Sequence, residues 1–408
     1  SRLLSGNSTL SLTLESNLAH IHNRPCALLC NSGYDANLSI LSSLPLSEDV
    51  VLMDALVHNS LIMGTRMSRV KKDNVLYFRH NDVNHLTQLL EKMQGRLGHV
   101  FVVVESVYSM DGDVAPLRDI LNVAETFHAR VIVDEAHGLG IYGKTNVGDL
   151  TLPECKQTSI HKQTKQEENN KEKQTETLIG GTGVLAALSL ESHPALLCSI
   201  HTFGKAAGCH GAVIASSATV VQYLINYARP FIYSTALPLH SLISIQCAYD
   251  SICGEEGEER RKRVFELVGV LRRQMIWRLT CLLSGDVSSS SNSQGWPQQA
   301  MIKQQQQISA IIQSILLPSP SPIQAVIVPG NEKCISLTNR LRLHGFDVYP
   351  IRSPTVPKGM ERIRIILHTH NTEREVFGLV DMLFESMKDD WSNNFVAKGG
   401  GRLPHSRL

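Results

Sequence analysis

The spacing of apolar residues along the chain predicts helices that alternate with short buried strands. Leu10, Leu14, Leu18 and Ile21 recur at helical spacing, as expected for a helix with one buried face. Short runs of consecutive apolar residues, many of them β-branched, are instead typical of strands buried on both faces. Such strands are expected at 27–30, 50–53, 100–105 and 130–134. Further amphipathic helices are expected at 86–93 and from 117 onwards, directly after Pro116.

This alternation indicates an α/β protein. Strands that are apolar on both faces form a mostly parallel sheet that helices cover on both sides. A second, smaller α/β group is expected near the C-terminus, with strands at 325–328 and 362–367. Thr372 and Glu375 form a capping box that should open the last helix. The sequence therefore predicts a large sheet domain followed by a smaller domain.

Changes of composition suggest where these domains begin and end. A large domain is expected at 1–245, a small one at 246–392 and a flexible tail at 393–408. Residues 162–176 contain no apolar side chain, which is typical of disorder, and lie in a surface insertion expected at about 151–190 that includes the apolar residues 184–188. A Ser- and Gln-rich segment at about 284–308 is interpreted as a second insertion.

The overall composition is that of a globular protein. The 408 residues are 42% hydrophobic and carry a formal net charge of +1. Without a basic excess no nucleic-acid partner is expected, and no apolar run is long enough for a membrane span. The nine cysteines are scattered, which indicates reduced thiols and no metal site. Because the chain begins with Ser1 rather than Met, its natural N-terminus is expected to lie upstream.

Two chemically unusual residues stand where predicted strands end. Lys205 follows the apolar run 194–200, where burial would lower the pKa of its ammonium and suit it to Schiff-base chemistry. Asp134 ends the strand at 130–134, and His137 follows three residues later. A lysine that forms an imine and an aspartate that protonates a pyridine nitrogen are the pair used by enzymes of pyridoxal 5'-phosphate (PLP). The chain is therefore interpreted as a PLP enzyme.

A series of short motifs then resembles the α-oxoamine synthases, which are PLP enzymes of fold type I that condense an amino acid with an acyl-CoA. The motifs span nearly the whole chain apart from the two insertions, and their joint order is highly specific. They stand at 1–6, 32–37, 57–60, 109–113, 134–138, 202–205, 227–235 and 352–357.

The resemblance implies roles for the residues around the cofactor ring. Lys205 would hold the PLP aldehyde and act as the base, and Asp134 would pair with the pyridinium nitrogen. His137 would bind the ring hydroxyl, and His58 would stack on the ring face beside the substrate.

The resemblance also implies a phosphate site that two subunits share. Gly33 and Tyr34 would offer backbone N–H groups at a helix N-terminus, where an anion is favoured. Ser234 and Thr235 would reach the phosphate of the neighbouring subunit, which implies a homodimer. Further cofactor hydroxyls are expected from Ser109 and Thr202.

Arg364 is the main candidate for binding the amino-acid substrate. It lies inside an apolar predicted strand, and its guanidinium needs an anionic partner because it cannot lose its charge. A structural salt bridge is the general alternative, whereas the resemblance implies a bidentate contact with the substrate carboxylate. Arg352 and Thr355 match a loop on the substrate side.

The resemblance implies a decarboxylating condensation. The motifs favour L-alanine and pimeloyl-CoA, giving 8-amino-7-oxononanoate, CoA and CO₂ in biotin synthesis. Glycine or serine with a different acyl-CoA is an alternative, as is a catalytically silent subunit that stabilises a partner. The final tripeptide Ser406, Arg407 and Leu408 matches the signal read by the peroxisomal import receptor, so a peroxisomal location is expected, with the cytosol as the alternative.

Overall fold

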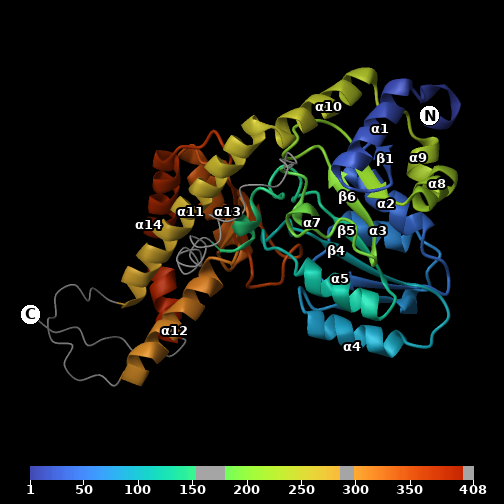
Figure 1. The fold of residues 1–408 in the computed structure, drawn as a ribbon. Helices are drawn as coiled ribbons and strands as arrows, with labels where there is room; N and C mark the ends of the chain where they lie inside the picture. The colour runs from blue at the N-terminus through green and yellow to red at the C-terminus, as the bar shows by residue number, and fades with distance from the viewer. Residues whose placement is uncertain (153–179, 285–297, 398–408) are drawn as a thin grey trace, which may run out of the picture. The chain divides into compact units, whose positions relative to one another are not determined.

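The computed structural model describes residues 1–152, 180–284 and 298–397 (Figure 1). Its contacts divide the chain into two units. Among the described residues, unit 1 holds 1–109, 114–150 and 180–261, and unit 2 holds 110–113, 151–152, 262–284 and 298–397.

Unit 1 is built on a seven-stranded sheet with the order β1-β7-β6-β5-β4-β2-β3. Every neighbouring pair is parallel except the two that involve β7, which runs antiparallel to β1 and β6. This confirms the mostly parallel sheet predicted from the apolar runs. The strands are β1 (Cys26–Cys30), β2 (Val50–Asp54), β3 (Val75–Phe78), β4 (Val100–Glu105), β5 (Arg130–Asp134), β6 (Leu196–Thr202) and β7 (Ala212–Ser216).

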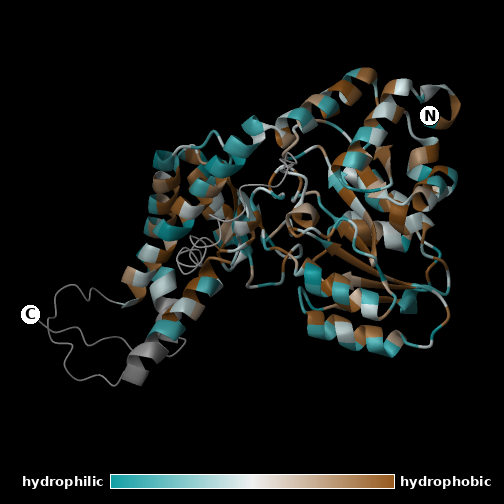
Figure 2. Cartoon of the chain, in the orientation of Figure 1, coloured by the Kyte–Doolittle hydropathy of each residue, from teal (hydrophilic) through white to brown (hydrophobic). Residues whose placement is uncertain are grey.

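Helices pack on this sheet through their apolar faces. Two of them, α4 and α5, lie side by side, and Figure 2 shows polar residues on the faces they turn to solvent. The predicted helix starting near Leu10 is confirmed as α1. The α-helices of unit 1 are α1 (Thr9–Ile21), α2 (Gly33–Ser43), α3 (Asn59–Arg66), α4 (Val83–Met93), α5 (Leu117–Thr126), α7 (Val184–Ala187), α8 (Ala218–Tyr227), α9 (Arg229–Tyr233) and α10 (Leu239–Cys253). Short helical turns complete the unit at η1 (Arg2–Gly6), η2 (Lys72–Asn74) and η3 (Val147–Leu150).

Local capping places two helix N-termini at the carboxyl edge of the sheet. Helix α2 begins three residues after β1, because Ser32 accepts a hydrogen bond from the backbone N–H of Asp35. Helix α3 follows β2, and the ring of His58 accepts the backbone N–H of Ser60. Since β1 and β2 point the same way, both helices start at the edge where the parallel strands end.

Unit 2 contains an antiparallel three-stranded sheet with the order β8-β10-β9. Residues 110–113 belong to it, because Asp111 pairs with Arg362 and the carbonyl of Gly112 accepts a hydrogen bond from Ser319 at 2.8 Å. The predicted capping box is confirmed, since Thr372 and Glu375 exchange both hydrogen bonds. The elements are α12 (Gln298–Ile315), β8 (Ile323–Ile327), α13 (Asn331–Leu343), β9 (Tyr349–Ile351), β10 (Arg362–Ile366) and α14 (Glu373–Ala397).

The structure moves several boundaries that composition suggested. Residues 184–188 were expected on the surface of the insertion, but the side chains of α7 are buried and its first N–H groups bond to Glu135. Helix α12 begins at Gln298, inside the expected second insertion, and buries Ile308 and Ile311. In both places buried apolar side chains make part of the expected insertion an ordinary part of the fold.

The other predicted domain boundaries, at residues 245 and 393, fall inside helices. Helix α14 runs to Ala397, into the expected tail, while residues 162–176 and 398–408 lie outside the described residues. The boundary suggested at residue 245 falls inside α10, and the two units divide within α11 (Glu255–Ser284). In the described part of the chain, no helix combines the length and apolarity that crossing a bilayer requires.

A candidate active site at the carboxyl edge of the sheet

Three neighbouring strands of unit 1 each end in a buried acid. Asp54 ends β2, Glu105 ends β4 and Asp134 ends β5, and Glu105 stands opposite Asp134 in the register of the sheet. Ligands of parallel α/β sheets bind beyond this edge. The acids therefore mark where the chemistry of the unit should be sought.

Asp134 is held by two hydrogen bonds. Its Oδ1 accepts the backbone N–H of Ala136 at 2.9 Å, and its Oδ2 accepts the side-chain amide of Asn37 at 2.8 Å. Only 4% of the residue is exposed, so water cannot replace either partner. This carboxylate is therefore fixed in position at the sheet edge.

Lys205 and His137 meet at the same edge. The Nζ atom of Lys205 lies 2.8 Å from Nε2 of His137. Lys205 stands three residues beyond the end of β6 and is exposed, so the expectation that this lysine is buried is wrong. The apolar run before it ends at the strand, and the turn that follows carries the lysine toward solvent.

His58 lies near the same residues. Its Nδ1 lies 2.7 Å from Oγ of Ser60 and also accepts the Ser60 backbone N–H at 3.2 Å. Burial lowers the pKa of His58, the nearby Asp134 opposes this shift and Lys205 adds to it. The structure thus brings four sequence-predicted residues together: His58, Asp134, His137 and Lys205.

Two buried glutamates were missed from the sequence. Burial, together with the negative charge of the neighbouring Asp134, raises the pKa of Glu105 to about 8. Burial likewise raises the pKa of Glu135 to about 7, although its carboxylate accepts hydrogen bonds from Ser106 at 2.6 Å and from the backbone of Leu185 at 2.7 Å. A charged residue closing an apolar strand, and one directly after Asp134, were the available signals.

A phosphate-sized anion could be held at the start of α2. A Cβ placed on Gly33 would come within 2.1 Å of Oγ1 of Thr202, so the hydroxyl at the end of β6 presses against the first turn of this helix. Backbone N–H groups at a helix N-terminus favour an anion. Tyr34, the next residue, is 44% exposed. The structure thus places Gly33, Tyr34 and Thr202 side by side.

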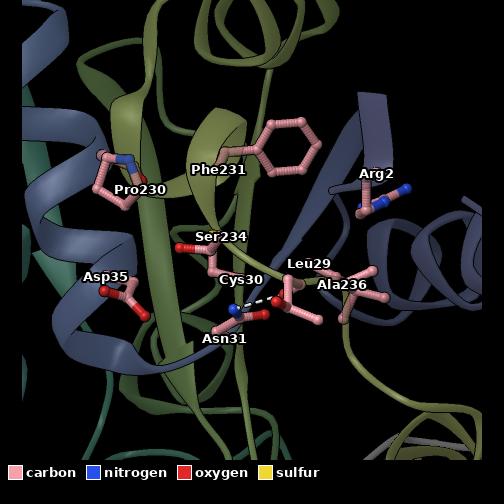
Figure 3. Close-up of a pocket in the computed structure, with 11 residues that line it drawn as sticks. Arg2, Leu29, Cys30, Asn31, Asp35, Pro230, Phe231, Ser234 and Ala236 are labelled. Carbon is pink, nitrogen blue, oxygen red and sulfur yellow. Dashed lines mark hydrogen bonds between the residues drawn. The ribbon is translucent and has the colours of Figure 1, made fainter. Parts of the chain in front are cut away.

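Ser234 and Thr235 follow α9 and line a cavity with residues of α2. Figure 3 shows Ser234 and Asp35 facing this cavity, and Nδ2 of Asn31 donates a hydrogen bond to the carbonyl of Thr235 at 2.8 Å. Ser109 follows β4, and among the described residues its side chain makes no hydrogen bond to the cluster around Asp134.

Three of the four predicted substrate residues, Arg352, Thr355 and Arg364, lie in unit 2, whereas His58 lies in unit 1. Arg364 is on β10, where burial lowers its pKa. Its Nε is buried without a hydrogen-bond partner among the described residues, and none of their acids forms an ion pair with it. The structural salt bridge that was the general alternative is therefore not seen in the described part of the chain.

The donor set of unit 1 fits PLP. A lysine amine, a fixed buried carboxylate and a helix N-terminus are what the aldehyde, the ring nitrogen and the phosphate of this cofactor require. The contact between Gly33 and Thr202 leaves no room for a side chain where the backbone would face the phosphate.

Comparison with known proteins agrees with this chemistry. The profile of the family described as aminotransferase class I and II matches residues 1–287. An 8-amino-7-oxononanoate synthase from Emericella nidulans is 32% identical over 395 residues, covering 94% of this chain and 79% of the relative. The enzyme of the same name from Cupriavidus necator is 33% identical over 388 residues, covering 94% and 78%.

Solved structures support the fold. Serine palmitoyltransferase from S. paucimobilis superposes with a TM-score of 0.69 at 23% identity, covering 95% of this chain and 79% of the other. An 8-amino-7-oxononanoate synthase from Francisella tularensis gives a TM-score of 0.66 at 21% identity, covering 95% and 89%. At such identities the likeness concerns the fold alone.

The comparisons overturn the predicted peroxisomal location. The similar relatives are fungal and bacterial 8-amino-7-oxononanoate synthases, and bacteria such as Cupriavidus necator and Neisseria meningitidis have no peroxisomes. A three-residue match is short enough to arise by chance, and residues 406–408 lie outside the described part of the chain.

Proposed function

The chain belongs to the class I and II aminotransferase family and groups with relatives named 8-amino-7-oxononanoate synthase, and on this basis we propose that it is a PLP-dependent C-acyltransferase of biotin synthesis. The reaction joins L-alanine to pimeloyl-CoA. It forms a bond between Cα of alanine and the thioester carbonyl carbon, and it releases CoA and CO₂. The product is 8-amino-7-oxononanoate.

One observation carries this proposal. The amine of Lys205 lies 2.8 Å from His137, which follows the buried Asp134 by three residues at the carboxyl edge of the sheet. A silent subunit would not need this arrangement, because a contact between an exposed lysine and a histidine contributes little to stability.

PLP, when bound, supplies an electron-accepting ring that stabilises negative charge at Cα of the amino acid. Lys205 would hold its aldehyde carbon, Asp134 its ring nitrogen and His137 its ring hydroxyl. Gly33, Tyr34 and Thr202 would hold the phosphate, with Ser109 contributing a further hydroxyl.

The chain's own residues would handle protons and orientation. Lys205 would also take the Cα proton of the amino acid, since its amine is exposed at the carboxyl edge of the sheet. His58 would lie over the ring and help to orient the substrate. The positive charge of Arg364 would bind the alanine carboxylate in a two-bond contact, with Arg352 and Thr355 nearby on the substrate loop.

We also propose that two copies of the chain share their active sites. Ser234 and Thr235 stand in an exposed stretch beside apolar side chains that face solvent, among them Tyr233 at 81% exposure and Leu239 at 60%. A second copy would cover these side chains and receive the two hydroxyls at its phosphate site.

Intersubunit complementation tests the shared site. The Lys205→Ala variant and the double variant Ser234→Ala/Thr235→Ala should each be inactive. Mixed dimers should regain activity, because one of their two sites then holds all three side chains. Light scattering that shows a monomer, or mixtures that stay inactive although mixed dimers form, would contradict the proposal.

The substrate assignment is tested with purified protein, PLP and a panel of acyl-CoA thioesters. Alanine, glycine and serine are each supplied, and released CoA is measured with a thiol reagent, with Lys205→Ala as the blank. Alanine with pimeloyl-CoA should give the highest kcat/KM. Preference for glycine or for serine with a long acyl chain would assign another reaction of the family, and no turnover of any pair would favour the silent subunit.

A further inference from the structure

A chain of hydrogen bonds connects Asp134 to His58 through two residues that no part of the proposed reaction uses. Nδ2 of Asn37 lies 2.8 Å from Oδ2 of Asp134 and 2.8 Å from Oγ of Ser60. Oγ of Ser60 lies 2.7 Å from Nδ1 of His58. Asn37 is 2% exposed and Ser60 is fully buried, so solvent does not compete for these contacts.

The chemistry of the groups gives this chain a single direction. A carboxylate only accepts, so Asp134 requires the amide of Asn37 to present its NH₂ group rather than its oxygen. The second N–H of that group then points at Ser60, whose oxygen must accept it. The hydroxyl hydrogen of Ser60 is left with Nδ1 of His58 as its acceptor among the described residues.

The backbone points to the same assignment of protons. The N–H of Ser60 also donates to Nδ1 of His58, at 3.2 Å. A nitrogen that accepts two hydrogen bonds carries no proton itself. The ring proton of neutral His58 therefore sits on Nε2.

We propose that Asn37 and Ser60 are positioning residues that tie His58 to Asp134 and hold its imidazole neutral, with Nδ1 as acceptor and the proton on Nε2. Asn37 lies in α2 and Ser60 lies in the first turn of α3, so these hydrogen bonds also hold both helices against the end of β5. Burial lowers the pKa of His58, which also favours the neutral ring.

The consequence for catalysis rests on the proposed function, but the proton assignment does not. In a PLP enzyme, a neutral His58 would present an N–H donor rather than a second cation beside Lys205. The assignment itself follows from the contacts of this chain and can be measured in protein without cofactor.

The test uses the full chain, with PLP and after its removal. Deuterium exchange at the C2 carbon of each histidine, followed by mass spectrometry, gives the pKa of His58 alone. Ser60→Ala removes the hydroxyl donor but keeps the backbone. It should raise the pKa of His58 by about one unit, the equivalent of one hydrogen bond to the neutral ring. Ser68→Ala, just beyond α3, is the matched control and should leave that pKa unchanged.

A double-mutant cycle separates a connected chain from independent contacts. Asn37→Leu should shift the pKa of His58 in the same direction and no further than Ser60→Ala. The double variant should match Ser60→Ala alone, because Asn37 acts only through Ser60. Additive shifts would overturn the link to Asn37.

Two further outcomes are decisive. An unchanged pKa of His58 in a folded Ser60→Ala protein would overturn the proton assignment. The second outcome comes from NMR of protein labelled with ¹⁵N-histidine, in which the His58 signals are those lost in His58→Gln. A protonated Nδ1 of His58 would also overturn the proton assignment. If these results hold while the substrate panel shows no turnover, only the proposed function fails.

Discussion

The replacement Asp134→Asn tests the centre of the site, because it keeps the shape of the side chain and removes its charge. In the native chain the carboxylate accepts one hydrogen bond from Ala136 and one from Asn37. An amide offers one oxygen, so its NH₂ group must face one of these two donors. The oxygen of Asn37 has no partner among the described residues, and that amide can turn to relieve the clash.

The expected loss of stability follows from these contacts. Hydrogen bonds to a charged group contribute about 1.5–3 kcal/mol and neutral ones about 0.5–1.5 kcal/mol, so weakening two of them should cost about 2 kcal/mol. The expected loss of catalytic rate is a separate and more specific effect. An amide cannot hold the pyridinium proton, and losing a preorganised electrostatic partner lowers the rate at least about 100-fold.

Both quantities can be measured on one preparation. Urea unfolding followed by circular dichroism gives the stability, and CoA release from pimeloyl-CoA and alanine gives the rate. Asp119→Asn, an exposed aspartate in the first turn of α5, is the control for the same chemical change. Activity of Asp134→Asn within a few-fold of the native protein would refute the contact with the ring nitrogen.

Four further predictions follow from the same geometry. Lys205→Ala should abolish turnover, and borohydride reduction of the native protein with PLP should label Lys205 and no other lysine in peptide maps. Arg364→Ala should raise the KM for the amino acid far more than that for the acyl-CoA, because losing one partner of a buried charge pair costs roughly 2–5 kcal/mol. Gly33→Ala should weaken PLP binding at least about tenfold by fluorescence titration, since the added Cβ would meet Thr202 at 2.1 Å. Stability should fall below about pH 6.5, because burial lowers the pKa of His22 to about 3 and that of His201 well below its usual value.

The sign and the controls of these experiments are fixed by the structure. A buried histidine with a depressed pKa binds its proton only when unfolded, so its stabilising effect is present above about pH 6.5 and is lost as the pH falls. Each such histidine adds a slope of about 1.4 kcal/mol per pH unit to the free energy of unfolding, and His201→Phe should remove one of these two contributions.

Gly148→Ala, in which the added Cβ meets no atom within 4 Å, is the control for Gly33→Ala. Equal rises of both KM values would make Arg364 structural, and PLP affinity equal to that of the control would remove Gly33 from the phosphate site.

Local sequence was enough to predict the strands and to identify Asp134 and Lys205 as the catalytic pair. Runs such as 100–105 and 130–134 are typical of buried strands, and the residues that end parallel strands meet at one edge of the sheet. The positions of Asp134 and Lys205 after such runs therefore predicted a PLP site without any knowledge of the packing. The family's motif order then added His58, His137 and the substrate residues as hypotheses.

Tertiary structure decided what surrounds each of these residues. Asn37 and Asp134 are 97 positions apart, and no spacing rule links an amide on α2 to an acid on β5. Their contact arises because α2 packs against β6, the neighbour of β5 in the sheet. The buried state of Glu105, the exposure of Lys205 and the burial of α7 have the same origin. Periodicity reports which residues leave water, whereas partners and charge states depend on which elements meet, and only the folded chain brings them together.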